Sequence, residues 1–137
     1  MYHSRKIGVF ISHLFGEYQH NLCQGILDTA KEYGYLVEIF ASTDGETPNT
    51  LAGEEGILTI PSYQDFDGII FANETYPEYR LADAIYKQVT QHCSCPVLVI
   101  NQEAHASNNV ILDNNAPFAD LTEHFITVHH AARICYL

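Results

Sequence analysis

This sequence has few positively charged residues and no long apolar run. Six Lys and Arg stand against seventeen Asp and Glu among 137 residues, which gives a formal charge of -11. Such a surface repels phosphate backbones, so we predict that this segment binds no nucleic acid. No apolar run approaches the roughly 20 residues that cross a bilayer, and no small-x-small cleavage pattern follows residues 1–15. We therefore expect a cytoplasmic chain with no membrane partner.

Cysteine is also sparse. The four cysteines form neither a disulfide framework nor a paired zinc motif. We interpret Cys23 and Cys135 as buried thiols, the first in a helix and the second in a terminal strand. The segment 92–95, His-Cys-Ser-Cys, has a metal-like composition, but an exposed helix end before Pro96 is the favoured interpretation. We expect no metal and no cofactor.

The apolar residues that are present come in five short runs, each nearly continuous rather than alternating with polar residues. Continuous runs are typical of strands that helices cover on both faces. Their spacing leaves room for a helix between most of them, as in parallel βαβ units. We therefore predict an α/β domain with three layers around a doubly wound parallel sheet. The runs are residues 7–11, 36–40, 68–72, 97–100 and 110–112.

Apolar residues at helical spacing predict two helices, over about residues 18–33 and 78–91, and a third that contains Phe118 and Phe125. Gly34 is placed to end the first helix in the left-handed conformation, and residues 113–115 to cap the third. Residues 50–55 are expected to form a short helix or turn, and residues 57–60 either a small strand or a loop. Residues 133–137 are expected to open one more strand.

Motifs for nucleotides and catalysis are largely missing. The loop after the first predicted strand has one glycine and places Glu17 where a pyrophosphate would sit, which argues against a dinucleotide site. No P-loop, G-x-S-x-G elbow or HExxH pair is present. His13 and Glu17 could form an acid/base pair at helical spacing, but no nucleophile or metal motif accompanies them. We predict that the chain is not an enzyme.

Five segments resemble, in the same order, the periplasmic-binding-protein-like domains of the LacI type. The likeness covers nearly the whole chain, and each segment is weak alone. The segments are the first strand with Gly25, Ala30 and Gly34 after it, the Phe-Asp-Gly-Ile-Ile step at 66–70, the strand and loop at 95–101, the Val-Ile-Leu-Asp-Asn step at 110–114, and residues 130–137. The resemblance implies two α/β lobes that are joined by a hinge and close on a small ligand.

In that family the present chain would be a truncated piece. The resemblance implies that residues 1–112 form the first lobe and that residues 113–137 begin the second, whose remainder is absent. It also implies a small-molecule effector, of the sugar, nucleoside or amino acid class, and a homodimer. The segments 16–19 and 53–68 further resemble sensor domains that begin bacterial signalling proteins, including diguanylate cyclases.

Ligand contacts in the family lie on the loops that follow the strands. Asn101 and Gln102 replace the Asp-Arg pair that often holds a sugar, so the charged fork of a typical sugar site is missing. Tyr18 either stacks on a ligand ring or packs at the start of its helix, and Asn73 and Glu74 either face the cleft or lie in a solvated loop. The predicted ligand-binding residues are Ser12, His13, Tyr18, Gln19, Asn73, Glu74, Asn101 and Gln102.

Three functions are left open. The leading hypothesis is a small-molecule-sensing regulatory domain that acts by closure of its lobes. The second is a dimerisation or interaction module without a ligand of its own, in which the helix at 78–91 lies in the interface. The third is a small α/β enzyme.

Overall fold

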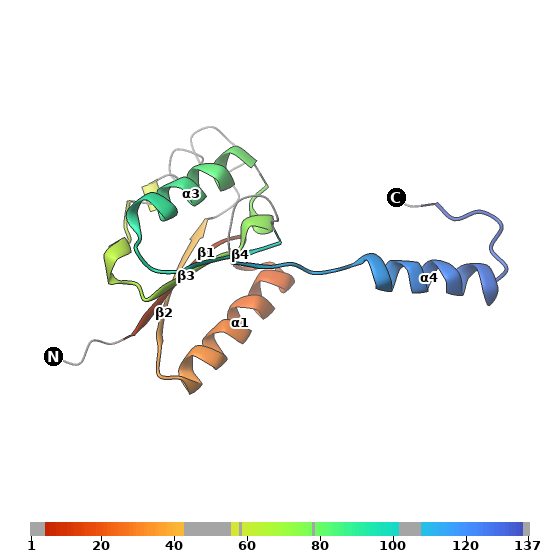
Figure 1. Ribbon diagram of the computed structural model, residues 1–137, viewed down its shortest axis with the longest axis horizontal. Coiled ribbons are helices and arrows are strands. Elements are labelled where there is room, and N and C mark those ends of the chain that lie inside the picture. Colours follow the sequence, from red (N-terminus) through yellow and green to blue (C-terminus); the bar gives the residue numbers. More distant parts are fainter. Residues whose placement is uncertain (1–4, 43–55, 58, 78, 102–107, 136–137) are drawn as a thin grey trace.

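The structure is a computed structural model that describes residues 5–42, 56–57, 59–77, 79–101 and 108–135. Its centre is a five-stranded parallel sheet in the order β2-β1-β3-β4-β5. Helix α1 lies on one face of this sheet and α3 on the other (Figure 1). The predicted three-layer α/β fold is therefore confirmed. The strands are β1 (Lys6–Ser12), β2 (Leu36–Ser42), β3 (Gly68–Phe71), β4 (Val97–Ile100) and β5 (Asn109–Val110).

The α-helices lie within one or two residues of their predicted positions. They are α1 (Glu17–Glu32), α3 (Tyr79–His92) and α4 (Asn115–Thr127), with short 3₁₀ helices η1 (Tyr63–Asp65) and η2 (Asn73–Thr75). Gly34 has a φ of 74°, and the Tyr35 N–H donates to the Ala30 carbonyl at 2.8 Å. This is the left-handed helix end that the sequence predicts, and it turns the chain directly into β2.

The continuous apolar runs are explained by burial on both faces of the sheet. In β1, Val9, Phe10 and Ile11 are each at most 1% exposed, although successive side chains point to opposite faces. β1 pairs with β2 and β3 in parallel register, with Phe10 opposite Phe40 and Phe71. A strand in the middle of a covered sheet has no solvent side on which a polar residue would be favoured.

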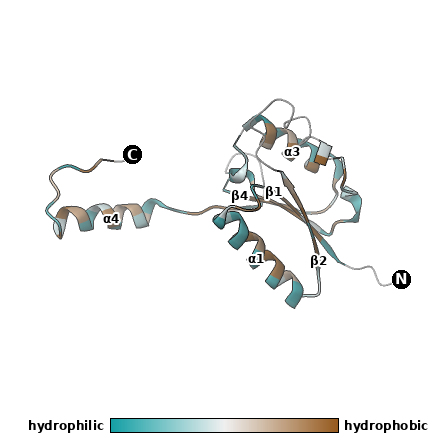
Figure 2. Cartoon of the chain, turned by 180° about the vertical axis from the view of Figure 1, so that it is seen from behind, coloured by the Kyte–Doolittle hydropathy of each residue, from teal (hydrophilic) through white to brown (hydrophobic). Residues whose placement is uncertain are grey.

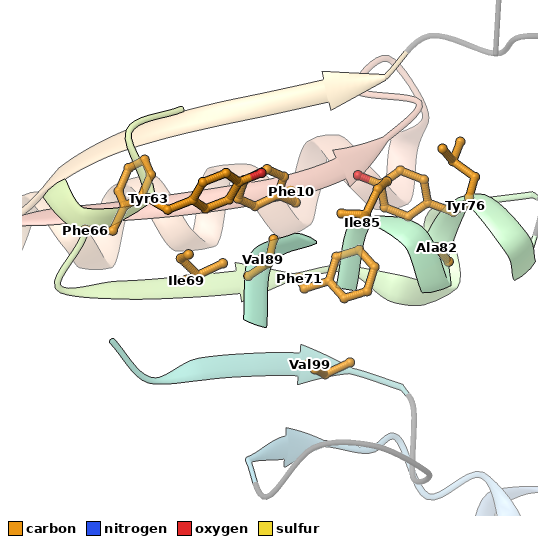
Figure 3. Packing of buried hydrophobic residues seen from close by; sticks show 11 residues of the cluster. Phe10, Tyr63, Phe66, Ile69, Phe71, Tyr76, Ala82, Ile85, Val89 and Val99 are labelled. Carbon is orange, nitrogen blue, oxygen red and sulfur yellow. The ribbon is translucent and has the colours of Figure 1, made fainter. Parts of the chain in front are cut away.

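The main core lies between the sheet and α3 (Figure 3). Phe10 and Phe40 stack with their ring centroids 5.0 Å apart, and Tyr63 stacks on Phe10 at 6.0 Å. The aromatic residues from η1 and the strands thus close one end of this core. The buried members are Phe10, Tyr63, Phe66, Ile69, Phe71, Tyr76, Leu81, Ala82, Ile85, Val89 and Val99.

The face of the sheet that carries α1 is covered much less completely. Its buried cluster contains Ile11, Cys23 and Ala72, with Leu22 and Ile39 among the partly buried residues around it. The two faces of the sheet are therefore unequal, since the α3 side holds most of the buried apolar residues. Cys23 is buried, as predicted.

One predicted feature of the chain differs in the structure, and the structure decides one alternative that the sequence left open. The described part of the expected last strand, Arg133 to Cys135, is irregular and has no strand beside it, so Cys135 is exposed. Of the two alternatives for residues 57–60, the described residues do not form a strand: the Ile60 N–H donates to the Ile57 carbonyl at 3.2 Å, and Ile60 is 71% exposed. The short helix or turn predicted at 50–55 falls outside the described residues.

Helix α4 stands away from the sheet at the end of an extended segment (Figure 1). None of its residues is buried. The predicted cap is present in a modified form, because Asn114 is the N-cap while the Asp113 carboxylate accepts the Asn115 N–H at 2.9 Å. No helix in the described part of the chain is long and apolar enough to cross a membrane.

Candidate functional site

The site is built at the carboxyl edge of the sheet, where the loops after β1, β3 and β4 meet. Parallel α/β sheets bind ligands at this edge because the helix starts and the strand ends converge there. Ser12 ends β1 and is buried, and its N–H donates to Thr75 Oγ1 at 2.9 Å. Thr75 Oγ1 in turn donates to the Ala72 carbonyl at 2.7 Å. Thr75, which the sequence analysis did not single out, therefore joins the loop after β3 to the end of β1.

His13 turns the chain out of β1 in the left-handed conformation, with a φ of 58°. Its N–H donates to the Ser42 carbonyl at 3.1 Å, and its own carbonyl accepts the Gly16 N–H at 2.8 Å. The Gln19 side chain lies directly over Gly16, where a Cβ would come 2.2 Å from Gln19 Oε1. A larger residue at position 16 would therefore displace the Gln19 side chain from this loop.

Tyr18 in the first turn of α1 reaches across the edge to the loop after β3. Its hydroxyl donates to Glu74 Oε1 at 2.5 Å. Desolvation, followed by the hydrogen bond and the charge of Glu74, raises the pKa of Tyr18 to about 12. The Tyr18 side chain is 49% exposed, so one part of the ring is open to a ligand.

Asn101 follows β4 and is the second non-glycine residue of this edge with a positive φ, at 57°. Its N–H donates to the Val110 carbonyl at 2.8 Å, and its Oδ1 accepts the Leu112 N–H at 2.9 Å. Asparagine tolerates the left-handed region better than most residues. Because Oδ1 is used by the backbone of residue 112, the Nδ2 amide is the part of this side chain that is available to a ligand.

Tyr18 and Asn101 line the same pocket, of about 360 Å³. Its remaining wall is apolar and comes from α1, β3, β4, β5 and the segment after β5. These lining residues are Leu22, Ile26, Ile70, Leu98, Ile100, Val110, Ile111 and Leu112. The edge therefore combines an aromatic ring, a carboxylate and an amide beside an apolar pocket, which is the usual chemistry of a small-molecule site.

The other predicted residues have different surroundings. Asn73 is half-buried and starts η2, where its carbonyl accepts the Tyr76 N–H at 3.2 Å. Gln102 falls outside the described residues. Ser42, which ends β2, is 5% exposed, and its Oγ has no hydrogen-bond partner within the described ranges. A buried, unpartnered hydroxyl is costly, so Ser42 is a candidate contact that the sequence analysis missed; a polar residue at the end of a buried strand was the available signal.

The metal-like segment at the end of α3 lies apart from this edge. His92 Nδ1 is hydrogen-bonded to the Gln88 carbonyl at 2.9 Å, and Cys93 Sγ donates to the Cys95 carbonyl at 3.7 Å. Desolvation and the neighbouring Cys93 raise the pKa of Cys95 to about 11. No group of three or more metal-ligating side chains converges among the described residues.

No family model matches the chain, and no curated protein matches it. The chain is similar to a solved structure, the crystal structure of the Lac repressor dimer bound to operator and the anti-inducer ONPF, with a TM-score of 0.64 and 20% sequence identity. The match covers 91% of this chain but 36% of the repressor chain, so the chain spans well under half of that protein. The likeness establishes the fold: a parallel α/β lobe of the LacI and periplasmic-binding-protein type.

Proposed function

We propose that this chain is the sensing lobe of a regulatory domain that binds a small molecule at the carboxyl edge of its sheet. The observation that carries the proposal is an apolar pocket of about 360 Å³ that Tyr18 and Asn101 both line, with Glu74 bonded to the Tyr18 hydroxyl at the same edge. His13 and Asn101 hold left-handed backbone conformations at the same edge. Such conformations cost free energy and are concentrated at ligand sites.

The proposed ligand is neutral or cationic. Glu74 is the one charged residue among the predicted contacts, and no Lys or Arg is among them. A carboxylate favours hydroxyl, amine or ring N–H donors and repels phosphates and carboxylates. Sugars, nucleosides and amines therefore fit this wall better than sugar phosphates do, with Tyr18 stacking on the ring and Asn101 Nδ2 donating to an acceptor.

The mechanism that we propose is differential binding to an open and a closed state. Residues 1–112 form the sensing lobe, and residues 113–137 begin a second body that faces it. A ligand held between the two stabilises the closed arrangement by its difference in affinity for the two states. The output is transcription regulation or, as the likeness to sensor domains of diguanylate cyclases suggests, another bacterial signalling response in the cytoplasm.

The proposal is tested by thermal unfolding of the 137-residue chain with a panel of sugars, nucleosides and amino acids. A ligand at 100 times its Kd stabilises the folded state by about 2.7 kcal/mol, so a binder raises the melting temperature. Tyr18→Ala and Asn101→Asp should abolish the rise; the second change keeps the acceptor for the Leu112 N–H and removes the amide donor. Tyr33→Ala, at the other end of α1 and 72% exposed, is the matched control.

Two outcomes would contradict the proposal. In the first, no compound of the panel stabilises the chain. In the second, a compound does so equally in the wild type, in Tyr18→Ala and in Asn101→Asp, which would locate binding elsewhere.

A further inference from the structure

Two cysteines, Cys93 and Cys95, stand on either side of Ser94 in the segment that joins α3 to β4. Helix α3 has hydrophobic and hydrophilic residues along its length (Figure 2), and Val89 on its inner side is fully buried. Cys93 follows Val89 by about one turn, and its N–H donates to the Val89 carbonyl at 3.0 Å. Both cysteines are half-buried and pack against the main core, whereas Ser94 is exposed. The two thiols therefore lie on the same, inner side of the segment.

The side chains of the two cysteines interact directly. Cys93 Sγ donates to the Cys95 carbonyl at 3.7 Å, and Cys93 acts on the Cys95 thiol by its charge and by a side-chain hydrogen bond. Desolvation is the first cause that raises the pKa of Cys95 to about 11, so this thiol keeps its proton at neutral pH. Because the thiolate is the reactive form, Cys93 is the member of the pair that reacts first.

The backbone on both sides of the pair is fixed. The Cys93 N–H is bonded to the end of α3, and the Pro96 carbonyl accepts the Ile69 N–H at 3.0 Å, where β4 joins β3. Pro96 has a restricted φ and also restricts the residue before it, which is Cys95. The fold thus keeps the second thiol close to the first, and such proximity raises its effective concentration.

A cavity of about 260 Å³ opens beside the pair. Cys93 and Cys95 both line it, together with the polar side chains of Thr90, Ser94 and Asn108. A small reagent can therefore reach the two sulfur atoms without the main core opening. The cavity borders the start of β4, whereas the pocket assigned to the ligand lies at the edge where β4 ends, so the two sites are separate.

We propose that Cys93 and Cys95 form a reversible disulfide by exchange with a low-molecular-weight disulfide. The Cys93 thiolate attacks one sulfur of the reagent, whose S–S bond breaks; one half leaves as a thiol and the other stays on Cys93 as a mixed disulfide. Cys95 Sγ then attacks Cys93 Sγ, and its proton passes to the departing second half. The cysteines lose two electrons and two protons, and the reagent takes them up as two thiols. A ring closed over one residue is strained, and strained disulfides are readily reduced.

Peptide mapping of the folded 137-residue chain tests the proposal. Trypsin cleaves after Lys87 and Arg133, which places the pair on residues 88–133 and Cys135 on residues 134–137. The probe is hydroxyethyl disulfide, which is uncharged and is not repelled by a chain of formal charge -11. After acid quenching and N-ethylmaleimide, the pair peptide should lack two hydrogen atoms and carry no label. Cys135, a single exposed thiol, should carry only the probe's adduct. Dithiothreitol should restore both thiols of the pair.

Three variants test the order of the steps. Cys95→Ser should stop the reaction at the mixed disulfide on Cys93, because the second thiol is missing. Cys93→Ser should acquire an adduct at Cys95 at least several-fold more slowly than at Cys135, because burial holds the Cys95 proton. Ser94→Ala is the matched control: it removes the exposed hydroxyl between the two cysteines and should form the disulfide as the wild type does.

A comparison with the unfolded chain separates the fold from the spacing of the two cysteines. In urea, at the same ratio of thiol to disulfide, the oxidised fraction of the pair peptide should be several-fold lower. An equal or larger fraction in urea would overturn the proposal. It would also be overturned by separate adducts on both cysteines, by a link from either of them to another cysteine, or by an unreacted pair in a chain whose Cys135 is labelled.

Discussion

Tyr18 and Glu74 lie 56 positions apart in the sequence, and the hydroxyl of one donates to the carboxylate of the other at 2.5 Å. The bond joins the first turn of α1 to the loop after β3, across the carboxyl edge of the sheet. It fixes the orientation of the Tyr18 ring and occupies one carboxylate oxygen of Glu74. The other oxygen, together with the exposed face of the ring, is what the proposed site offers to a ligand.

Replacing Glu74 by glutamine should lower the pKa of Tyr18. Desolvation is the largest cause of the raised pKa, and the hydrogen bond and charge of Glu74 come next. Glu74→Gln removes the charge and leaves the burial, so the pKa should fall from about 12 but stay above the ordinary 10.0. Ultraviolet titration of the tyrosines measures this, with Tyr18→Phe to assign the transition. An unchanged titration would contradict the interaction.

The folded state should lose stability between pH 10 and pH 12. Burial is the first cause that raises the pKa of Tyr63 to about 12 from 10.0, and the nearby Cys93 adds to it. The folded chain therefore holds this proton more tightly than the unfolded chain. The resulting stability is complete below pH 10 and is lost as the pH rises toward 12. In urea titrations at several pH values, Tyr63→Phe should flatten this fall, and an unchanged fall in the variant would contradict the assignment to Tyr63.

Thr75→Val should destabilise the chain by about 1–3 kcal/mol, because the Ser12 N–H loses its buried acceptor. Thr75 is 8% exposed, and valine has nearly its shape. Thr90→Val is the matched control: Thr90 is exposed and its hydroxyl donates to the Tyr86 carbonyl of its own helix, so a change within ~0.5 kcal/mol is expected. Equal effects in chemical denaturation would contradict the bridging role of Thr75.

Gly25→Ala and Gly34→Ala should shift stability in opposite directions. A Cβ at either position meets nothing within 4 Å, so neither substitution changes the packing. The backbone conformation at each position therefore determines the sign of the change in stability. Gly25 lies inside α1, where alanine should stabilise by about 0.5–1 kcal/mol. Gly34 has a φ of 74°, a region that costs a residue with a Cβ roughly 1–2 kcal/mol. The denaturant midpoints of the two variants test this prediction, and midpoints that shift in the same direction would contradict it.

The cysteines should react with iodoacetamide in an order that follows exposure. The thiolate is the reactive form, and burial raises the pKa of Cys23 and is the first cause for Cys95. Cys135 is exposed. A time course at mildly alkaline pH, followed by peptide mass spectrometry, should label Cys135 first and Cys23 and Cys95 late. Early labelling of Cys23 would show that α1 opens readily from the sheet.

The order of the strands and helices was predictable because each apolar run and each helical pattern is set by residues close together in the sequence. The ends of the strands were harder to predict: Ser12 and Ser42 are polar, yet they pair with each other in the ladder between β1 and β2. The strand expected at 133–137 failed because a strand needs a neighbour, and no sequence pattern specifies whether one is present.

The sequence predicts which loops carry the candidate residues, and the structure shows which of those residues lie close together. Tyr18, Glu74 and Asn101 follow from the rule that loops after parallel strands hold the ligand. The use of Asn101 Oδ1 by the Leu112 backbone, and the bridge through Thr75, depend on loop geometry over distances that no local pattern encodes. The unpartnered Ser42 hydroxyl becomes visible only when neighbouring strands are assembled.

Helix α4 has 13 residues and no buried side chain. Isolated helices of about 12–15 residues are marginal in water, so its hydrogen bonds alone hold it weakly. Its apolar side chains, such as Phe118 and Leu121, are 54% and 48% exposed, so a contact that covers them should raise the helix content of this segment. For residues 115–127, helix formation and contact with another surface are then one coupled equilibrium.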